Sequence, residues 1–194
     1  NMISSKIYDP IETELKQLRS NAHRLNLLNN QTLETEVDKR KQILDELLPN
    51  RHPSVFLQGP IYFDYGKFTK IGENSYANFN LTILDCAPVT IGKNVFMGPN
   101  VSLYPPIHPK HYEDRHLYYN HEKGYVTDKE AALPIVIEDD CWLAGNVVVC
   151  GGVTIGRGSV IGAGSVVTRD IPPMSFAAGN PARVIRQITE ADKL

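Results

Sequence analysis

The chain has 194 residues, of which 42% are hydrophobic, and this is enough for one sizeable core and an accessory element. Its 20 basic and 22 acidic residues are mixed along the chain and give a net charge of −2, which argues against nucleic acid or an anionic membrane as the partner. The three cysteines form no CxxC pair, and no apolar run approaches the roughly 20 residues that span a bilayer. We therefore expect one main domain in the cytoplasm, without disulfides or structural zinc, that acts on a small molecule or a protein.

Two helices are predicted at the start of the chain. Asp9 can cap the first, a proline follows it at the first helical position, and apolar residues then recur at helical spacing. The second helix is expected over Thr32–Leu48, with Val37 facing inward. We interpret residues 1–52 as a helical accessory region that covers the open first coil of a repeat structure in residues 53–194.

A six-residue period runs through the rest of the chain. Over residues 137–172 it reads IEDDCW, LAGNVV, VCGGVT, IGRGSV, IGAGSV and VTRDIP, so an aliphatic residue opens each copy. Two positions per copy point inward, and glycine gathers at the second to fourth positions, where the backbone must turn. The pattern predicts a mainly β fold, a left-handed parallel β-helix in which three copies make one triangular coil. Earlier copies begin at Ile71, Ala77, Ile83, Ile91, Met97 and Leu103.

A long excursion interrupts the repeat after His108. Residues 109–133 are polar and aromatic without any period, and a loop of that length inside a compact repeat is usually functional. Because the chain leaves the coil at a histidine, His108 is the first candidate for chemistry. Its imidazole, with an unperturbed pKa of about 6.5, is suited to take a proton from a hydroxyl group at neutral pH.

The order of the motifs resembles the sugar O-acetyltransferases of the maltose and galactoside acetyltransferase type, which are hexapeptide-repeat proteins. The resemblance covers nearly the whole chain and implies that acetyl passes directly from acetyl-CoA to a hydroxyl of maltose, glucose or a galactoside. It also implies a homotrimer that needs no metal and shares each active site between two subunits. The matching segments are YDP near the start, YANFNLTILD at 76–85, IHP at 107–109, PIVIEDDCWLAGNVVV at 134–149 and GAGSVVTRDIPPMSFAAGNPARVIR at 162–186.

The same resemblance implies a role for individual residues. His108 is the general base, and the backbone N–H of Gly145 donates to the oxyanion that develops during transfer. Acetyl-CoA is expected along the coils, with its phosphates at arginine side chains, whose planar fork donates two parallel hydrogen bonds. The implied cofactor contacts are Gly145, Ala163, Thr168, Arg183 and Arg186, and the implied sugar contacts are Asp9, Asp64, Asn78, Asp85 and Glu130.

Other interpretations stay open. The acceptor could be serine, an antibiotic or an oligosaccharide instead of a simple sugar. A γ-type carbonic anhydrase shares the coil and binds zinc through three histidines, and His116 and His121 have an H-x4-H spacing. A non-catalytic binding module would also show the repeats.

The cysteines near the only tryptophan raise the question of a covalent intermediate. Cys141 precedes Trp142, and Cys150 lies in the following copies of the repeat. A reactive thiol needs a neighbouring cation or helix N-terminus to lower its pKa, and the sequence places no cation beside either one. We therefore expect direct transfer without an acetyl-cysteine.

Overall fold

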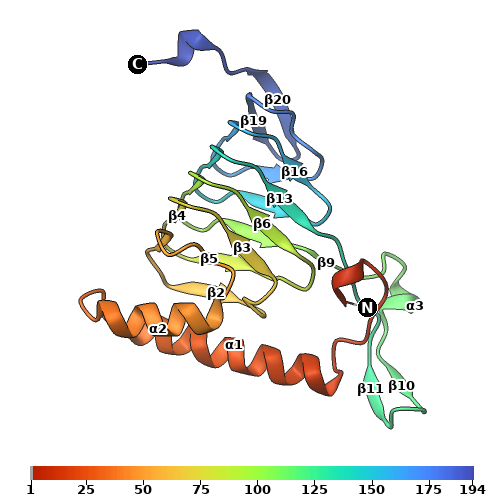
Figure 1. Ribbon diagram of the computed structural model, residues 1–194. Coiled ribbons are helices and arrows are strands. Elements are labelled where there is room, and N and C mark those ends of the chain that lie inside the picture. The colour runs from red at the N-terminus through yellow and green to blue at the C-terminus, as the bar shows by residue number, and fades with distance from the viewer. Residues whose placement is uncertain (1) are drawn as a thin grey trace.

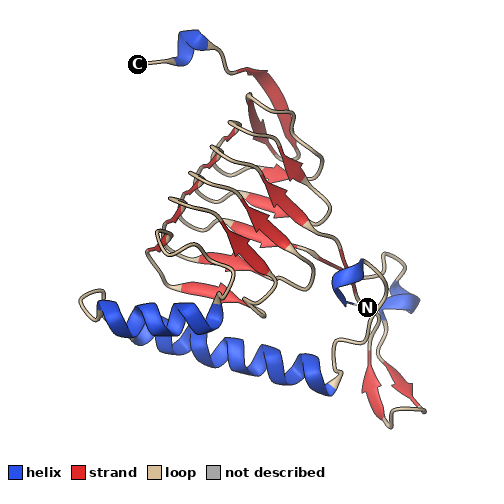
Figure 2. Cartoon of the chain, in the orientation of Figure 1, coloured by secondary structure: helices blue, strands red, loops and turns tan. Residues whose placement is uncertain are grey.

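The computed structural model describes residues 2–194 as a triangular prism of stacked coils (Figures 1 and 2). Two helices lie across the end of the prism formed by the first coil, and the C-terminal strands and a short helical turn lie at the opposite end. The predicted β-helix is confirmed. Neither long helix of the described chain is apolar enough to cross a membrane.

Each side of the prism is a parallel sheet to which successive coils contribute one strand. Side 1 consists of β3 (Thr69–Ile71), β6 (Val89–Ile91), β13 (Ile135–Ile137) and β16 (Thr154–Ile155). Side 2 consists of β1 (Phe56–Leu57), β4 (Tyr76–Ala77), β7 (Phe96–Met97), β14 (Trp142–Leu143), β17 (Val160–Ile161) and β19 (Ser175–Gly179), with β20 (Ala182–Gln187) added antiparallel. Side 3 consists of β2 (Ile61–Phe63), β5 (Leu81–Ile83), β8 (Ser102–Tyr104), β15 (Val148–Cys150) and β18 (Val166–Val167).

The core is a stack of aliphatic side chains along the prism axis. Ile91, Ile137 and Ile155 are cross-strand neighbours on side 1, and all three are buried. Full burial of such a side chain contributes about 1.5–3 kcal/mol relative to exposure, so the strict register of the copies supplies much of the stability. The expectation that two positions per copy face inward is confirmed, because the fifth positions are buried too. These are Cys141, Val147, Val153, Ser159, Ser165 and Ile171.

The helices α1 (Thr13–Gln31) and α2 (Val37–Leu47) close the first coil and share its core. Leu25 of α1 and Leu47 of α2 are buried in the same cluster as Ile61 of β2. Two asparagines of α1 also form hydrogen bonds with the backbone groups along the outer edge of β2. The amide of Asn26 exchanges two hydrogen bonds with the backbone of Phe63, and that of Asn30 does the same with Ile61. A strand edge that would otherwise invite pairing with another chain is thereby covered.

Both helices begin later than the sequence predicted. Glu12 occupies the N-cap of α1, and the Asp9 side chain does not cap it because that carboxylate binds donors from the excursion. Thr32 ends α1 instead of starting α2, since its hydroxyl donates to the Leu28 carbonyl and its N–H to that of Asn29. The inward orientation expected of Val37 is wrong, because this first residue of α2 is exposed.

The excursion is more regular than its sequence indicated. β9 (Pro106–Ile107) pairs antiparallel with β12 (Ala131–Ala132) at its base, and a hairpin projects from the prism beside the N-terminal segment (Figure 1). Tyr118, Tyr119 and Val126 of the hairpin strands are exposed, and the buried residue, Thr127, is polar. The strands therefore carry no apolar alternation that sequence reasoning could detect. The remaining elements are η1 (Met2–Ser4), α3 (Tyr112–Arg115), β10 (Tyr118–Asn120), β11 (Tyr125–Thr127) and η2 (Glu190–Asp192).

Candidate active site

The predicted site residues fall at two different corners of the prism. Corner 2/3, where side 2 leads into side 3, contains residues 78–80, 98–101, 144–147 and 162–165; corner 3/1, where side 3 leads into side 1, contains 84–88 and the whole excursion. Asp64, Asp85 and Thr168 directly follow strands of side 3, and His108 and Glu130 lie at the start and near the end of the excursion, so all five belong to corner 3/1. Asn78, Gly145 and Ala163 belong to corner 2/3. Arg183 and Arg186 lie on β20.

His108 opens the excursion directly after β9. It lines a cavity of about 410 Å³ together with Ile7 of the N-terminal segment and Lys110, Glu130 and Ala131 of the excursion. The imidazole is 52% exposed, so a substrate can reach it, and its Nδ1 lies 3.8 Å from Oδ2 of Asp128. A half-open histidine between carboxylates is able to accept a proton from a bound hydroxyl.

The N-terminal segment holds Glu130 at the edge of this cavity. Tyr8 and Glu130 form an isolated antiparallel bridge, and the Tyr8 hydroxyl donates to Oε1 of Glu130 over 2.6 Å. Burial, together with this hydrogen bond, raises the pKa of Tyr8, so the hydroxyl stays a donor at all ordinary pH values. The sequence prediction missed Tyr8, although it stands in the YDP motif beside Asp9.

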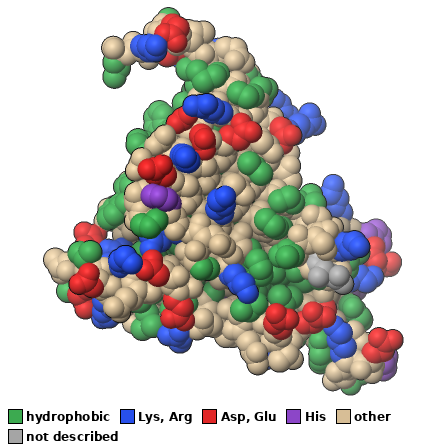
Figure 3. Space-filling view, in the orientation of Figure 1, with side chains coloured by type: hydrophobic (Ala, Val, Ile, Leu, Met, Phe, Trp, Pro, Cys, Tyr) green, Lys and Arg blue, Asp and Glu red, His purple; other side chains and the backbone are tan. Residues whose placement is uncertain are grey.

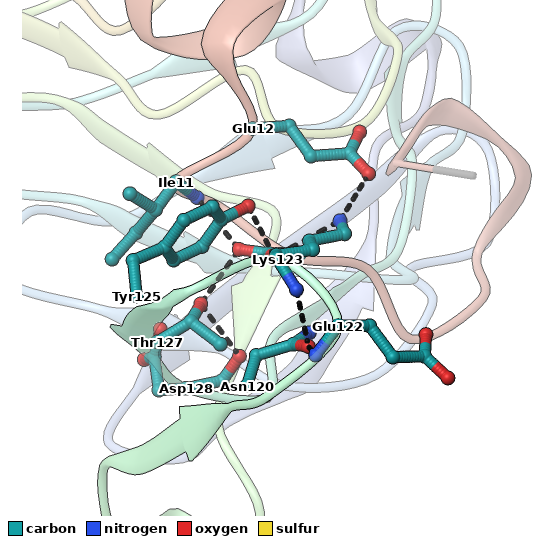
Figure 4. Close-up of polar contacts among 9 residues, drawn as sticks. Ile11, Glu12, Asn120, Glu122, Lys123, Tyr125, Thr127 and Asp128 are labelled. Carbon is teal, nitrogen blue, oxygen red and sulfur yellow. Dashed lines mark hydrogen bonds and ion pairs between the residues drawn. The ribbon is translucent and has the colours of Figure 1, made fainter.

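Asp9 fastens the N-terminal segment to the hairpin. The side chains of Tyr125, Thr127 and Lys123 all donate to its carboxylate. Figure 4 shows these three donors gathered in one cluster of polar contacts. The shortest contact is the 2.6 Å hydrogen bond from the Thr127 hydroxyl, and the backbone N–H of Ile11 donates as well. Burial alone would raise the pKa of Asp9, but the donors outweigh it and lower the pKa to about 2. In this chain both oxygens are occupied by protein groups.

Asp85 is also fully engaged by the protein. It is completely buried, and its two oxygens accept hydrogen bonds from three backbone N–H groups and one hydroxyl. Burial raises the pKa of Asp85, while these donors act in the opposite direction. The carboxylate therefore organises corner 3/1 of the first coil and exposes no oxygen to a ligand. The donors come from Tyr65, Gly66, Phe68 and Thr69.

Asp64 lies at the same corner, between α1 and Cys86. Its Oδ1 is 3.3 Å from Nε2 of His23, and its Oδ2 accepts from the Cys86 thiol. Burial raises the pKa of Cys86, and the thiol also contacts the Tyr8 side chain, so Cys86 connects Asp64 with the Glu130 pair. The sequence prediction assigned no role to Cys86, although it directly follows Asp85 at the end of a matching motif.

Gly145 and its neighbours form the other corner. The carbonyl of Gly145 accepts from the N–H of Gly164 in the next coil, but its own N–H meets no acceptor within residues 2–194. A side chain at Gly98 would come within 2.6 Å of the Gly145 nitrogen, so the backbones approach closely here. An unpaired backbone N–H is what an oxyanion donor requires. β15 runs from this corner to corner 3/1, so Gly145 and His108 lie at opposite ends of side 3 within one chain.

The two arginines lie at the C-terminal end of the prism. The Arg186 guanidinium binds Asp192 through two nitrogens, over 2.6 and 2.9 Å, and lies over the Phe176 ring. Among residues 2–194, the Arg183 side chain donates only to the neighbouring carbonyl of Ala182. A phosphate would therefore meet Arg183 directly and would have to compete with Asp192 for Arg186.

The structure does not assemble the zinc site of a carbonic anhydrase. Within the described chain, the one group of three potential ligands whose donor atoms lie within 4.8 Å of one another is His108, Asp128 and Glu130. It contains a single histidine, whereas His116 and His121 are exposed in the excursion outside this group. A three-histidine zinc site is thus not formed by the residues that suggested it.

Comparison with known proteins agrees with the fold and the motifs. The family model "Bacterial transferase hexapeptide (six repeats)" matches residues 134–169, and "Maltose acetyltransferase hexapeptide capping motif" matches residues 1–51. The galactoside O-acetyltransferase of Escherichia coli K12 is 40% identical over 159 residues, which cover 82% of this chain and 73% of that protein.

Solved structures give the same relationship. The maltose O-acetyltransferase from Clostridium difficile 630 has a TM-score of 0.87 and 39% identity, covering 97% of this chain and 96% of that chain. A galactoside acetyltransferase in complex with coenzyme A also has a TM-score of 0.87 and 39% identity, with 97% and 90% coverage. The resemblance predicted from the sequence is thereby confirmed. The chain belongs to the hexapeptide-repeat acetyltransferases, in the family of the maltose and galactoside O-acetyltransferases.

Proposed function

We propose that this enzyme transfers the acetyl group of acetyl-CoA to a hydroxyl group of a sugar such as maltose, glucose or a galactoside. The three relatives reported above are named maltose or galactoside acetyltransferases, and the structure of one of them holds coenzyme A. In this chain the proposal is carried by His108, a half-exposed histidine in a cavity at the point where the coil opens into the excursion.

The mechanism we propose is direct transfer. The unprotonated Nε2 of His108 removes the proton of the acceptor hydroxyl as its oxygen attacks the thioester carbonyl. The N–H of Gly145 stabilises the resulting oxyanion, and collapse of the tetrahedral intermediate breaks the C–S bond. The imidazolium then returns the proton to the departing thiolate of coenzyme A.

The cysteines take no part in this mechanism. Burial raises the pKa of Cys141 to about 11, and its thiol donates to the carbonyl of Gly156 over 3.3 Å, so it behaves as a small buried side chain. All three cysteines are free thiols. Because free thiols persist in reducing compartments, we place the enzyme in the cytoplasm.

Glu130 and Asp64 are the carboxylates that we propose for binding the sugar hydroxyls. Glu130 lines the cavity of His108, and Asp64 is partly exposed at the same corner. Asp9 and Asp85 have a structural role near this corner, because their carboxylate oxygens accept hydrogen bonds from protein donors. Asn78 is at corner 2/3, so it reaches the sugar of a site that includes the neighbouring subunit.

The division of the site between two corners supports a homotrimer. His108 and Gly145 are at opposite ends of side 3, so one chain does not bring the base and the oxyanion donor together. A neighbouring subunit whose corner 2/3 meets corner 3/1 of the first chain would complete the site. Ala163 and the acetyl-CoA groove then lie in the contact, with Thr168 contributed from corner 3/1.

A panel of acceptors tests the proposed function. Purified protein is incubated with acetyl-CoA and maltose, glucose, galactosides, serine or an aminoglycoside, and the released thiol is measured. We expect release with a sugar, and initial-rate lines that intersect, as a ternary complex requires. If thiol is released only with serine or the antibiotic, the acceptor is that compound and not a sugar.

Replacement of His108 tests the base. His108→Ala should lower kcat by about 10²–10⁴-fold, the usual contribution of a general base, while calorimetry shows acetyl-CoA binding unchanged. His111→Ala is the matched control, since His111 is an exposed histidine of the same excursion. A His108 variant with most of its activity would remove His108 from the mechanism.

A further inference from the structure

The carboxylate of Asp128 lies beside His108 and has no role in the proposed transfer mechanism. Oδ2 of Asp128 lies 3.8 Å from Nδ1 of His108, and the Asp128 side chain is only 21% exposed. This is the distance of an ion pair and is longer than a hydrogen bond. Catalytic hydrogen bonds are often long before substrate binds and shorten in the productive complex. The two groups are therefore close enough to form a hydrogen bond once a substrate is bound.

The backbone holds both members of the pair in place. Ala131 of β12 pairs with Ile107 of β9, which immediately precedes His108, so the two segments are joined by one short ladder. On the other side of Asp128, the hydroxyl of buried Thr127 donates to Asp9. The backbone of Asp128 thus lies between two anchored residues, which keeps its carboxylate within reach of the imidazole.

The other acidic groups near His108 have different partners. Glu130 accepts a 2.6 Å hydrogen bond from Tyr8, and Asp114 pairs with Lys129 over 3.7 Å. Within residues 2–194, the Asp128 carboxylate has no charged partner other than His108. Nε2 of His108 makes no hydrogen bond to any group of residues 2–194, so that nitrogen is available to a substrate.

We propose that Asp128 is a positioning residue for His108. Its carboxylate accepts the Nδ1–H of the imidazole and so fixes the tautomer in which Nε2 is unprotonated and able to act as the base. The same carboxylate stabilises the imidazolium that exists between proton removal and proton return. This inference rests on the proposed function of His108, and the experiment below separates the two.

The first measurement compares two near-isosteric substitutions. Asp128→Asn should lower kcat at least about tenfold, within the ~10⁴-fold known when the carboxylate partner of a catalytic histidine becomes an amide, and leave acetyl-CoA affinity and the melting temperature unchanged. Glu113→Gln is the control, because Glu113 lies 3.9 Å from Nδ1 of His111 in an equally spaced, exposed pair. It should leave kcat unchanged.

A double-mutant cycle shows whether Asp128 acts through His108. The double variant His108→Ala, Asp128→Asn should be no slower than His108→Ala alone, because a positioning residue has no effect once its histidine is gone. If Asp128→Asn slows the His108→Ala enzyme by the same factor as it slows the parent, Asp128 acts elsewhere and the inference fails. Full activity of Asp128→Asn would also overturn it.

Nitrogen-15 NMR of histidine-labelled protein reads the tautomer directly. The His108 signals, identified by their loss in His108→Ala, should show a protonated Nδ1 in the parent and a larger share of protonated Nε2 in Asp128→Asn. An unchanged tautomer would contradict the inference even if activity fell. An active His108→Ala variant would instead refute the proposed role of His108 as the base, so the two failures are distinguishable.

Discussion

Among individual residues, Asp85 illustrates how a carboxylate in a matching motif can serve the fold. Asp85→Ala would leave three backbone N–H groups and the Thr69 hydroxyl without an acceptor in a buried site. An unsatisfied buried polar group costs about 1–3 kcal/mol, so we expect the free energy of unfolding to fall by at least about 3 kcal/mol. Urea or thermal unfolding measures this loss.

The control for Asp85 is an exposed aspartate with a single donor. In the part of the chain that the structure describes, the Asp170 side chain accepts only the N–H of Thr154, at a solvent-exposed corner. Asp170→Ala should therefore cost no more than about 1 kcal/mol. Equal losses in the two variants would show that the buried donors find other partners and that Asp85 does not organise its corner.

The sequence singles out Asp9 and Asp85 as candidate site residues, but it does not reveal which groups their carboxylates bind. Both stand in motifs that the family resemblance relates to sugar binding. The donors that occupy them come from Thr127 in one case and from Tyr65 to Thr69 in the other, and only the folded chain brings these groups together. Asp128 carried no signal at all, because the excursion has no period and its pairing with His108 depends on the β9–β12 ladder.

At the scale of elements, the sequence repeat predicted the turns at the corners of the coil better than it predicted the structure of the excursion. The fourth position of the copies adopts positive φ, as the glycine-rich turns predicted, with values of 86°, 69° and 72° at Gly152, Gly158 and Gly164. Earlier copies place asparagine there, and the Asn100 amide joins a ladder between coils. The copy IEDDCW places Asp140 there, with a φ of 63°. Asparagine and aspartate tolerate this conformation better than other non-glycine residues, so one backbone requirement is met by three residue types.

The attachment of the hairpin to the N-terminal segment yields a prediction at the same scale. Asp9→Asn removes the charge that holds Lys123 and weakens the hydrogen bonds from Tyr125 and Thr127. Hydrogen exchange of the amides in β10 and β11 should become faster, while the coils keep their protection. Glu12→Gln is the control, because it removes only the exposed contact to Lys123.

The pH dependence of the attachment follows from the same carboxylate. The folded pKa of Asp9, about 2, lies below its unfolded value of about 3.9. The charged form is therefore favoured by folding, so the stabilisation is complete above about pH 4 and is lost as the pH falls toward 2. Exchange in the hairpin should accelerate over this range in the parent and change less in Asp9→Asn. Identical profiles would contradict the role of Asp9.

For the whole molecule, the arrangement of the sides points to the surface that would join the subunits of the proposed trimer. Aromatic side chains from successive coils of side 2 form an outward row in register. Hydrophobic side chains line the edge of the prism where β4 lies, as Figure 3 shows. Tyr76, Phe96 and Trp142 each stand two residues before corner 2/3 of their coil, so the row runs alongside the corner that holds Asn78 and Gly145. The members are Phe56, Tyr76, Phe96 and Trp142.

The row and the divided site predict a trimer that depends on side 2. Phe96 is 56% exposed in the single chain, so Phe96→Asp should leave the fold of each subunit intact and place a charge in the contact. Light scattering should then report a trimer for the parent and smaller species for the variant, and activity should fall although His108 is unchanged. Tyr62→Asp is the matched control, since Tyr62 is a 47% exposed aromatic residue on side 3. A parent protein that is monomeric at working concentration would refute the trimer, and a trimeric, active Phe96→Asp would place the contact on another side.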